Sequence, residues 1–139
     1  MHKVFVFGTL KEGFPNHKIN KGSRLEGNYL TKNRYPLYLI GNRFSPWLIL
    51  EKGNGHNVRG QVFMVSDTTL AEMDKLERTN ESDGYRRIEL TVISEESGEK
   101  LVAFAYGKSV EQLDNADIQL ELNGEYKLEH SLLYISIKR

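Results

Sequence analysis

One acidic residue of the chain has a position that fits acid–base chemistry. The segment 67–78 has the spacing of an amphipathic helix. At about 100° per residue its apolar side chains Leu70, Met73 and Leu76 share one face. Glu77 falls on the same face, in the last turn, where the helix dipole disfavours an anion. A carboxyl group in partly apolar surroundings has a raised pKa and can take up and return a proton near neutral pH. Glu77 is therefore a candidate acid–base residue; the alternative is that it turns to solvent or pairs with a neighbouring arginine.

A second candidate is the loop that follows the apolar run 3–7. Gly8 comes directly after this run, and a glycine there lets the backbone turn sharply and present N–H groups to a ligand. Gly8 and Gly13 have the spacing of a phosphate-binding loop, but Phe14 and Pro15 follow where that loop requires Lys and Ser or Thr. The loop is either a ligand-binding turn of another kind or an ordinary turn that ends a strand.

Other groups point away from the common catalytic centres. The chain has no cysteine, and its four histidines are scattered without metal-ligand spacing, so we predict no metal site and no thiol nucleophile. No Gly-x-Ser-x-Gly motif indicates a serine hydrolase. Asp74, at the edge of the apolar helix face, is expected to orient a neighbour or to cap a loop. Trp47, the single tryptophan, is expected in the core.

Composition narrows the class of protein further. The 139 residues fit one domain, 1–139, with a core of its own. Lys and Arg number 19 and so do Asp and Glu, and this zero net charge gives no reason to expect a nucleic-acid partner. No run approaches the roughly 18 apolar residues of a membrane span, and the N-terminal run is too short for a signal peptide. We therefore expect no membrane partner and a cytoplasmic location.

The elements that must position these residues are mostly strands. Short runs rich in Val, Ile, Phe and Tyr alternate with Gly and Asn, which is typical of strands and turns. We predict strands over 3–7, 24–33, 36–40, 58–65, 86–94 and 100–107. Asn123-Gly124 predicts a hairpin, and 131–137 is either a strand or a short helix. Many strands and one convincing helix predict an α+β fold with a curved or barrel-like sheet.

Short motifs occur in a fixed order along the chain. The first group is Val4-Phe5-Val6-Phe7-Gly8-Thr9-Leu10-Lys11, Tyr35-Pro36-Leu37 and Pro46-Trp47-Leu48. The second group is Gly60-Gln61-Val62-Phe63, Met73-Asp74-Lys75-Leu76-Glu77 and Tyr85-Arg86-Arg87. Over roughly residues 3–107 the sequence resembles the γ-glutamylcyclotransferase-like (AIG2-like) family, and among its branches it most resembles the γ-glutamylamine cyclotransferases.

The resemblance implies a fold and a site. The fold is a small mixed β-barrel with few flanking helices. Glu77 corresponds to the family's catalytic acid–base glutamate. The family's substrate-binding loop corresponds to Phe7, Gly8, Thr9 and Leu10. Phe7 stands where the family has tyrosine, so the backbone N–H groups of the loop are kept while the hydroxyl is absent.

The implied reaction is an intramolecular aminolysis of a small γ-glutamyl amide. The α-amine of the γ-glutamyl group attacks its own γ-carbonyl, 5-oxoproline forms and an amine leaves. The substrate supplies the nucleophile, so no cofactor is expected, and Tyr85 and Tyr106 are expected to form walls of the pocket. The partner is then the small-molecule substrate, and the protein a monomer or weak homodimer. The alternatives are a non-catalytic binding module of the same fold and a γ-glutamyl amide hydrolase or acyltransferase.

Overall fold

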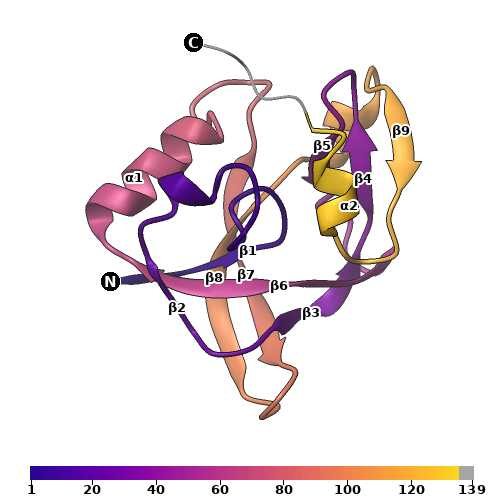
Figure 1. Ribbon diagram of the computed structural model, residues 1–139. Coiled ribbons are helices and arrows are strands. Elements are labelled where there is room, and N and C mark those ends of the chain that lie inside the picture. Colours follow the sequence, from indigo (N-terminus) through magenta and orange to yellow (C-terminus); the bar gives the residue numbers. More distant parts are fainter. Residues whose placement is uncertain (135–139) are drawn as a thin grey trace.

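Six strands form the main β-sheet of the computed structural model, which describes residues 1–134 of the chain. Their order is β1-β8-β7-β3-β6-β2, and β1 also pairs with β6, so that β1, β8, β7, β3 and β6 close into a ring (Figure 1). The sheet is mixed because β1 and β8 are parallel while the other pairings are antiparallel. The strands are β1 (His2–Val6), β2 (Ser23–Arg24), β3 (Tyr29–Tyr35), β6 (His56–Val65), β7 (Arg86–Ser94) and β8 (Lys100–Gly107). This mixed, sheet-dominated α+β fold confirms the prediction, and the ring is the closure that the expected barrel requires.

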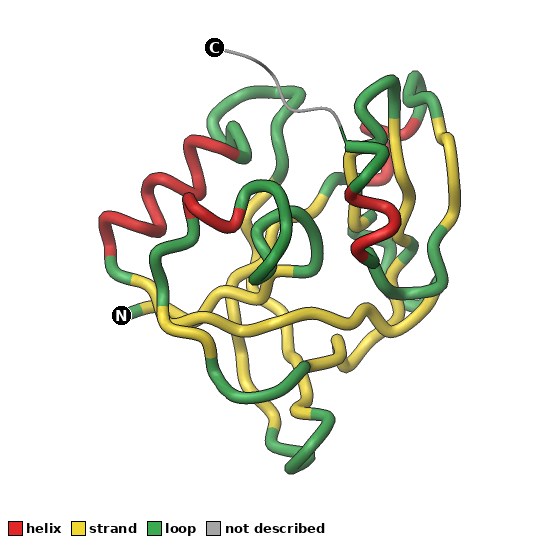
Figure 2. The backbone as a smooth tube through the Cα atoms, viewed as in Figure 1, coloured by secondary structure: helices red, strands yellow, loops and turns green. Residues whose placement is uncertain are grey.

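A smaller sheet and the helices lie around this ring. The second sheet has the order β5-β4-β9, with β4 (Leu37–Ile40), β5 (Ser45–Leu48) and β9 (Ile118–Glu121). The helical segments are α1 (Asp67–Leu76), α2 (Leu128–Ser131) and the 3-10 turns η1 (His17–Ile19) and η2 (Val110–Leu113). Figures 1 and 2 show α2 beside the second sheet and α1 on the opposite side of the molecule. In the part of the chain that the structure describes, no helix is long and apolar enough to cross a membrane.

The continuous apolar run of β1 serves two separate cores. Successive side chains of a strand point to opposite faces. Phe5 packs into a cluster that includes Phe7 and Tyr126, whereas Val4 and Val6 pack into a second cluster together with Met73 of α1. Because both faces of β1 are covered, an uninterrupted apolar sequence is what this strand requires.

Helix α1 begins as predicted and ends two residues earlier than predicted. The Ser66 side chain caps its first turn by accepting a hydrogen bond from the Thr69 N–H at 3.1 Å. The helix ends at Leu76, and Glu77 is its C-cap, with an N–H that still donates to the Met73 carbonyl. Arg78 then adopts a left-handed conformation with φ 55°, which turns the chain away from the helix axis. Glu77 is therefore fixed at the point where the helix ends.

The C-terminal part differs from the prediction. The Asn123-Gly124 hairpin is wrong, because β9 pairs with β4 and the chain continues into α2. Gly124, with φ 88°, packs so closely on β6 that a Cβ would come within 2.4 Å of the Asn57 carbonyl oxygen, and its own carbonyl accepts from the Arg59 N–H. The turn thus docks on another strand. Of the segment 131–137, residue 131 ends α2, while residues 135–137 lie outside the described residues.

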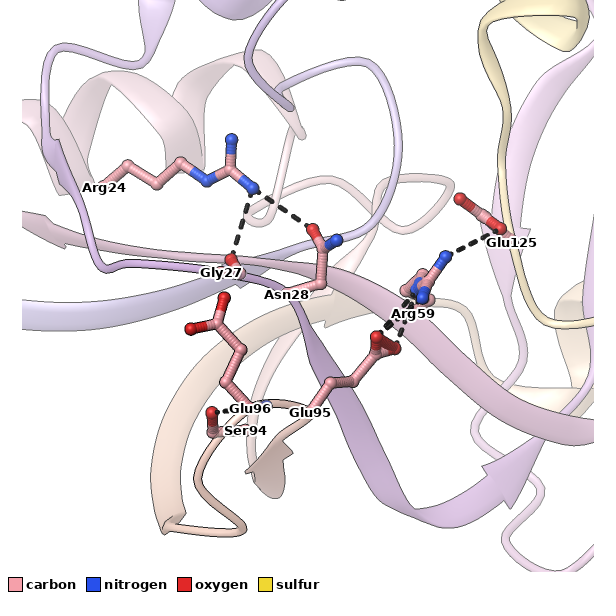
Figure 3. A network of polar contacts seen from close by, with 8 residues as sticks. All are labelled: Arg24, Gly27, Asn28, Arg59, Ser94, Glu95, Glu96 and Glu125. Atoms are coloured by element: carbon pink, nitrogen blue, oxygen red, sulfur yellow. Dashed lines mark hydrogen bonds and ion pairs between the residues drawn. The ribbon is translucent and has the colours of Figure 1, made fainter.

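Ion pairs on the surface also connect the segment after β9 to the ring. The Arg59 guanidinium of β6 pairs with Glu95, just after β7, at 2.6 Å and with Glu125 at 3.7 Å (Figure 3). The Arg59 guanidinium holds the pKa of the Glu95 carboxyl below its usual range. This network joins two strands of the ring to the segment that leads into α2.

Candidate active site

A cavity of 540 Å³ lies where the loop after β1, the strand β5, the end of α1 and the end of β8 meet. Its size is in the range of small-molecule sites. Every residue that the sequence and the resemblance assign to the site lines this cavity: Phe7, Gly8, Thr9, Leu10, Glu77, Tyr85 and Tyr106. The fold thus brings together residues from three distant segments of the chain.

The loop after β1 is held in a fixed shape against β5. A Cβ on Gly8 would come within 2.9 Å of the Pro46 ring, so only glycine allows this approach. Asn16 donates through its backbone N–H to the Thr9 carbonyl and through its side chain to the Thr9 hydroxyl, both at 2.8 Å. Within residues 1–134 the backbone N–H groups of Thr9 and Leu10 donate no hydrogen bond to another residue. These two donors are available to an anionic group of a ligand.

Phe7 belongs to the wall of the cavity and to the core at once. Only 6% of the residue is exposed, and its ring lies against Phe5 with the centroids 6.4 Å apart. The ring offers shape and apolar surface but no hydrogen bond. The contribution of this position to a ligand is therefore steric, and polar contacts come from the backbone of the residues that follow.

Glu77 has the surroundings of an acid–base residue. Burial raises the pKa of its carboxyl to about 7, and the positive charge of Lys108 acts in the opposite direction. No hydrogen-bond donor among the described residues reaches the carboxylate, and the alternative of a pairing with a neighbouring arginine is not seen there. The carboxyl group is thus free to exchange a proton with a ligand near neutral pH.

Tyr85 fixes the end of α1 against β5. Its backbone N–H donates to the Glu77 carbonyl at 2.9 Å, and its hydroxyl donates to the Pro46 carbonyl at 2.9 Å. Gly84 allows the tight return of the chain, because a Cβ there would lie 1.7 Å from the Arg78 carbonyl oxygen. Burial raises the pKa of the Tyr85 hydroxyl well above its ordinary value, so this group stays protonated.

Tyr106 is held through Asp74. The Tyr106 hydroxyl donates to one carboxylate oxygen of Asp74 at 2.7 Å, and Arg87 donates to the other at 2.5 Å. Burial and this hydrogen bond raise the pKa of the Tyr106 hydroxyl. Asp74 therefore orients a neighbour, as predicted, and Tyr106 forms a rigid wall of the cavity.

Two further cavity residues were missed or misassigned by sequence reasoning. The prediction that Trp47 lies in the core is wrong: it is half-buried and lines the cavity. The Nζ atom of Lys108 lies 4.3 Å from the Trp47 ring centroid and 4.5 Å from that of Tyr85, and it donates to the Asp83 carbonyl at 2.6 Å. The one sequence signal for Lys108 is its place directly after the apolar run 101–107, at the end of the predicted strand 100–107.

Comparison with known protein families identifies the family of this chain. The model of the family described as "Gamma-glutamyl cyclotransferase, AIG2-like" matches residues 4–128. The chain belongs to this γ-glutamyl cyclotransferase, AIG2-like family. The matched range contains all seven expected site residues, together with Trp47 and Lys108.

Relatives of this AIG2-like chain agree in sequence and in fold. A gamma-glutamylaminecyclotransferase of Mus musculus is 37% identical over 82 residues, which are 55% of this chain and 55% of the relative. The Bos taurus gamma-glutamylaminecyclotransferase is 35% identical over 108 residues, 74% of this chain and 63% of the relative. The matched regions thus cover little more than half the length of these curated relatives. The crystal structure of an AIG2-like protein from Mus musculus has a TM-score of 0.81 at 30% identity and covers 100% of this chain and 98% of that one.

The donor set of the cavity fits general acid–base chemistry. Among residues 1–134 no group of three or more His, Cys, Asp or Glu side chains could hold a metal ion. The cavity instead combines one carboxyl group that titrates near neutral pH, backbone N–H groups without a partner in the described part of the chain, and aromatic walls. Such a site can bind an anionic, amine-containing ligand and move one proton.

Proposed function

We propose that this protein is a γ-glutamyl cyclotransferase, which converts a γ-glutamyl amide into 5-oxoproline and a free amine. The observation that supports this most is the Glu77 carboxyl, with a pKa of about 7, in the same cavity as the loop of residues 7–10. The family membership points to the same activity. The substrate is a small molecule that carries its own nucleophile.

The proposed reaction uses Glu77 twice. The carboxylate first takes a proton from the α-ammonium of the substrate, which frees the lone pair of the nitrogen. This nitrogen attacks the γ-carbonyl carbon, a C–N bond forms and the five-membered ring closes. Glu77 then returns the proton to the nitrogen of the leaving amine as the original amide C–N bond breaks. The second proton of the ring nitrogen, which attack has made acidic, passes in the same way through Glu77 to the released amine, which departs as an ammonium ion. Atoms and charges balance without a cofactor or an added nucleophile.

The remaining residues act on the shape and charge of the substrate. Backbone N–H groups of Gly8, Thr9 and Leu10 bind either the α-carboxylate or the oxyanion that develops on the γ-carbonyl. The walls formed by Phe7, Tyr85 and Tyr106 hold the glutamyl chain in the folded shape that cyclisation needs, and such positioning is worth several kcal/mol.

We further propose that the substrate is a γ-glutamylamine. The names of the Mus musculus and Bos taurus relatives support this branch of the family. The cytoplasmic location and the monomer or weak homodimer stay predictions.

An assay that identifies the product tests the proposal. The purified protein is incubated with γ-glutamyl-ε-lysine, with γ-glutamyl amino acids and with glutathione, and 5-oxoproline and free glutamate are measured. We expect 5-oxoproline in amounts equal to the released amine. The isomer α-glutamyl-lysine is the control, because its amide cannot release lysine through a five-membered ring. Free glutamate as the product would favour the hydrolase, and binding without any product would favour the non-catalytic module.

A further inference from the structure

Lys108 is the charged neighbour that acts on Glu77 across the cavity. Glu77 ends α1, Lys108 follows β8, and both line the same cavity. Lys108 is only 4% exposed although it lies at a ligand-sized cavity. A lysine ammonium is strongly hydrated in water, so its burial here requires groups that replace water.

Those groups hold the ammonium at one place. The Asp83 carbonyl accepts a hydrogen bond from Nζ at 2.6 Å, and the rings of Trp47 and Tyr85 lie 4.3 and 4.5 Å from it. Aromatic faces attract a cation, and the attraction increases when water is excluded. These contacts replace part of the lost hydration: burial lowers the pKa of the Lys108 ammonium to about 8, so the group is still charged at neutral pH.

The backbone of Lys108 is fixed as firmly as its head group. Its N–H donates to the Leu48 carbonyl and its carbonyl accepts from the Leu50 N–H, both at 2.8 Å. These two bonds place it parallel to Ile49, in a bridge beside β5. Lys108 thus has little freedom to move away from the cavity.

Tyr85 links the two charged residues. The backbone N–H of Tyr85 donates to the Glu77 carbonyl, and the Tyr85 ring lies beside the Lys108 ammonium. Tyr85 therefore holds the backbone that carries Glu77 and contacts the Lys108 ammonium, and all three residues line the cavity. Attraction between opposite charges is larger for partly buried groups than on the surface.

We propose that Lys108 is a positioning residue whose charge, held at the same cavity, increases the fraction of Glu77 that is deprotonated and so able to accept the proton of the substrate ammonium. The inference rests on the acid–base role proposed for Glu77. Burial alone favours the neutral acid, which cannot accept a proton. The Lys108 charge opposes this effect.

The other charged groups around the pair do not replace Lys108. Tyr85 and Tyr106 face Glu77, and burial keeps both hydroxyls neutral. Asp83, Arg78 and Arg86 act on Lys108 from the loop after α1: Asp83 favours its charged form and the two arginines disfavour it. Asp83 itself pairs with Arg78 at 3.1 Å.

A titration of Glu77 in the free protein tests the inference without using catalysis. The carboxyl carbons are followed by ¹³C NMR against pH, and the Glu77 signal is assigned as the one lost in Glu77→Gln. We compare the wild type with Lys108→Met and Lys108→Arg, and use Lys100→Met, an exposed lysine at the other end of β8, as the matched control. Lys108→Gln removes the charge but keeps a donor for Asp83, and it replaces Lys108→Met if that variant fails to fold.

The expected result is specific to charge. Without Lys108 the midpoint of the Glu77 titration moves up by about one pH unit, because a nearby opposite charge lowers a carboxyl pKa by 1 to 3 units. Lys108→Arg restores the midpoint, and Lys100→Met leaves it unchanged. An unchanged midpoint in Lys108→Met or Lys108→Gln would overturn the inference.

The pH profile of catalysis gives the second measurement. The acid limb of kcat/KM for 5-oxoproline formation should move up with the titration, so Lys108→Met should lose roughly tenfold at pH 6 and little at pH 9. A uniform loss at every pH, or a raised KM with an unmoved acid limb, would contradict the proposed role. If no γ-glutamyl compound is converted but the Glu77 titration still shifts, the proposed function fails while the coupling of Lys108 to Glu77 stands.

Discussion

Two buried lysines in different regions of the molecule have nearly the same surroundings. Lys11 is 5% exposed and Lys108 is 4% exposed. Lys11 donates to the Tyr126 carbonyl at 2.5 Å and lies 4.2 Å from the Phe14 ring centroid, just as Lys108 lies between a carbonyl and two rings. Burial lowers the pKa of each ammonium to about 8.

The two lysines differ in whether they line the cavity and in which carboxylate acts on them. Lys108 lines the cavity and acts on Glu77, whereas Lys11 does not line it and is influenced by Glu125, which is also paired with Arg59. Lys11 joins the end of the binding loop to the segment before α2. A perturbed buried charge is therefore not enough to mark a reactive site; a cavity and a titratable partner inside it make the difference.

The largest expected effect separates the two carboxylates that face these lysines. Glu77→Gln keeps the size of the side chain but removes the proton acceptor, so 5-oxoproline formation should fall by about 10² to 10⁴-fold. Glu125→Gln, the matched change beside Lys11, should leave the rate within about twofold of the wild type. The rates are measured at saturating γ-glutamyl-ε-lysine. Equal losses in both variants would show that the cavity is not what distinguishes the two regions.

The second expected effect is on stability, to which Lys11 should contribute more than Lys108. Lys11→Ala leaves the buried Tyr126 carbonyl without its donor and removes the packing on Phe14, so the free energy of unfolding should fall by about 2 kcal/mol. Lys108→Ala should cost only about 1 kcal/mol, because water from the cavity can bind the Asp83 carbonyl. Urea unfolding followed by tryptophan fluorescence measures both. A greater loss in Lys108→Ala would mean that Lys108 serves the fold first.

The sequence indicated a candidate site residue where the signal was local. Glu77 stands out because an anion on the apolar face of α1 breaks a periodicity that can be read along ten residues. For the loop at Gly8 the local sequence left open a ligand-binding turn and an ordinary turn, and the role of the loop in substrate binding is a prediction from the resemblance. Strand β1 is buried on both faces and is apolar throughout, whereas β7 is buried on one face and its sequence alternates. Both strands were predicted correctly.

What the sequence could not predict depends on contacts between distant segments. Trp47 faces a cavity because Lys108 and Tyr85 lie beside it, and nothing near Trp47 in sequence indicates this. Gly124 has the local signature of a hairpin, but its docking on β6 decides its conformation. In each case the residue's role is set by tertiary packing, which overrides the local pattern.

A smaller effect concerns the pH dependence of stability, which both lysines should share. In the folded protein their ammonium groups lose protons near pH 8, and in the unfolded chain near 10.5. Between these values the unfolded chain binds more protons, so raising the pH stabilises the fold, by about 1 kcal/mol for each lysine from pH 8 to 9. Urea unfolding at pH 7, 8 and 9 should show this gain reduced in Lys11→Ala and reduced further in Lys108→Ala, because the higher Glu77 pKa of the second variant makes stability fall with rising pH over the same range. If neither variant changes how the free energy of unfolding depends on pH, burial does not lower the pKa of the two ammonium groups in the folded protein.

The smallest effect is expected for the exposed ion pairs that hold the same C-terminal segment as Lys11. The Arg59 side chain is 43% exposed, and its pairs with Glu95 and Glu125 are open to solvent and salt (Figure 3). Arg59→Gln should therefore lower the free energy of unfolding by only about 0.5 kcal/mol, and 0.5 M NaCl should abolish most of the difference. The loss in Lys11→Ala should persist in salt, because it comes from a buried hydrogen bond and from packing. A loss in Arg59→Gln as large as that in Lys11→Ala would mean that the surface pairs, and not the buried lysine, hold the C-terminal segment against the ring.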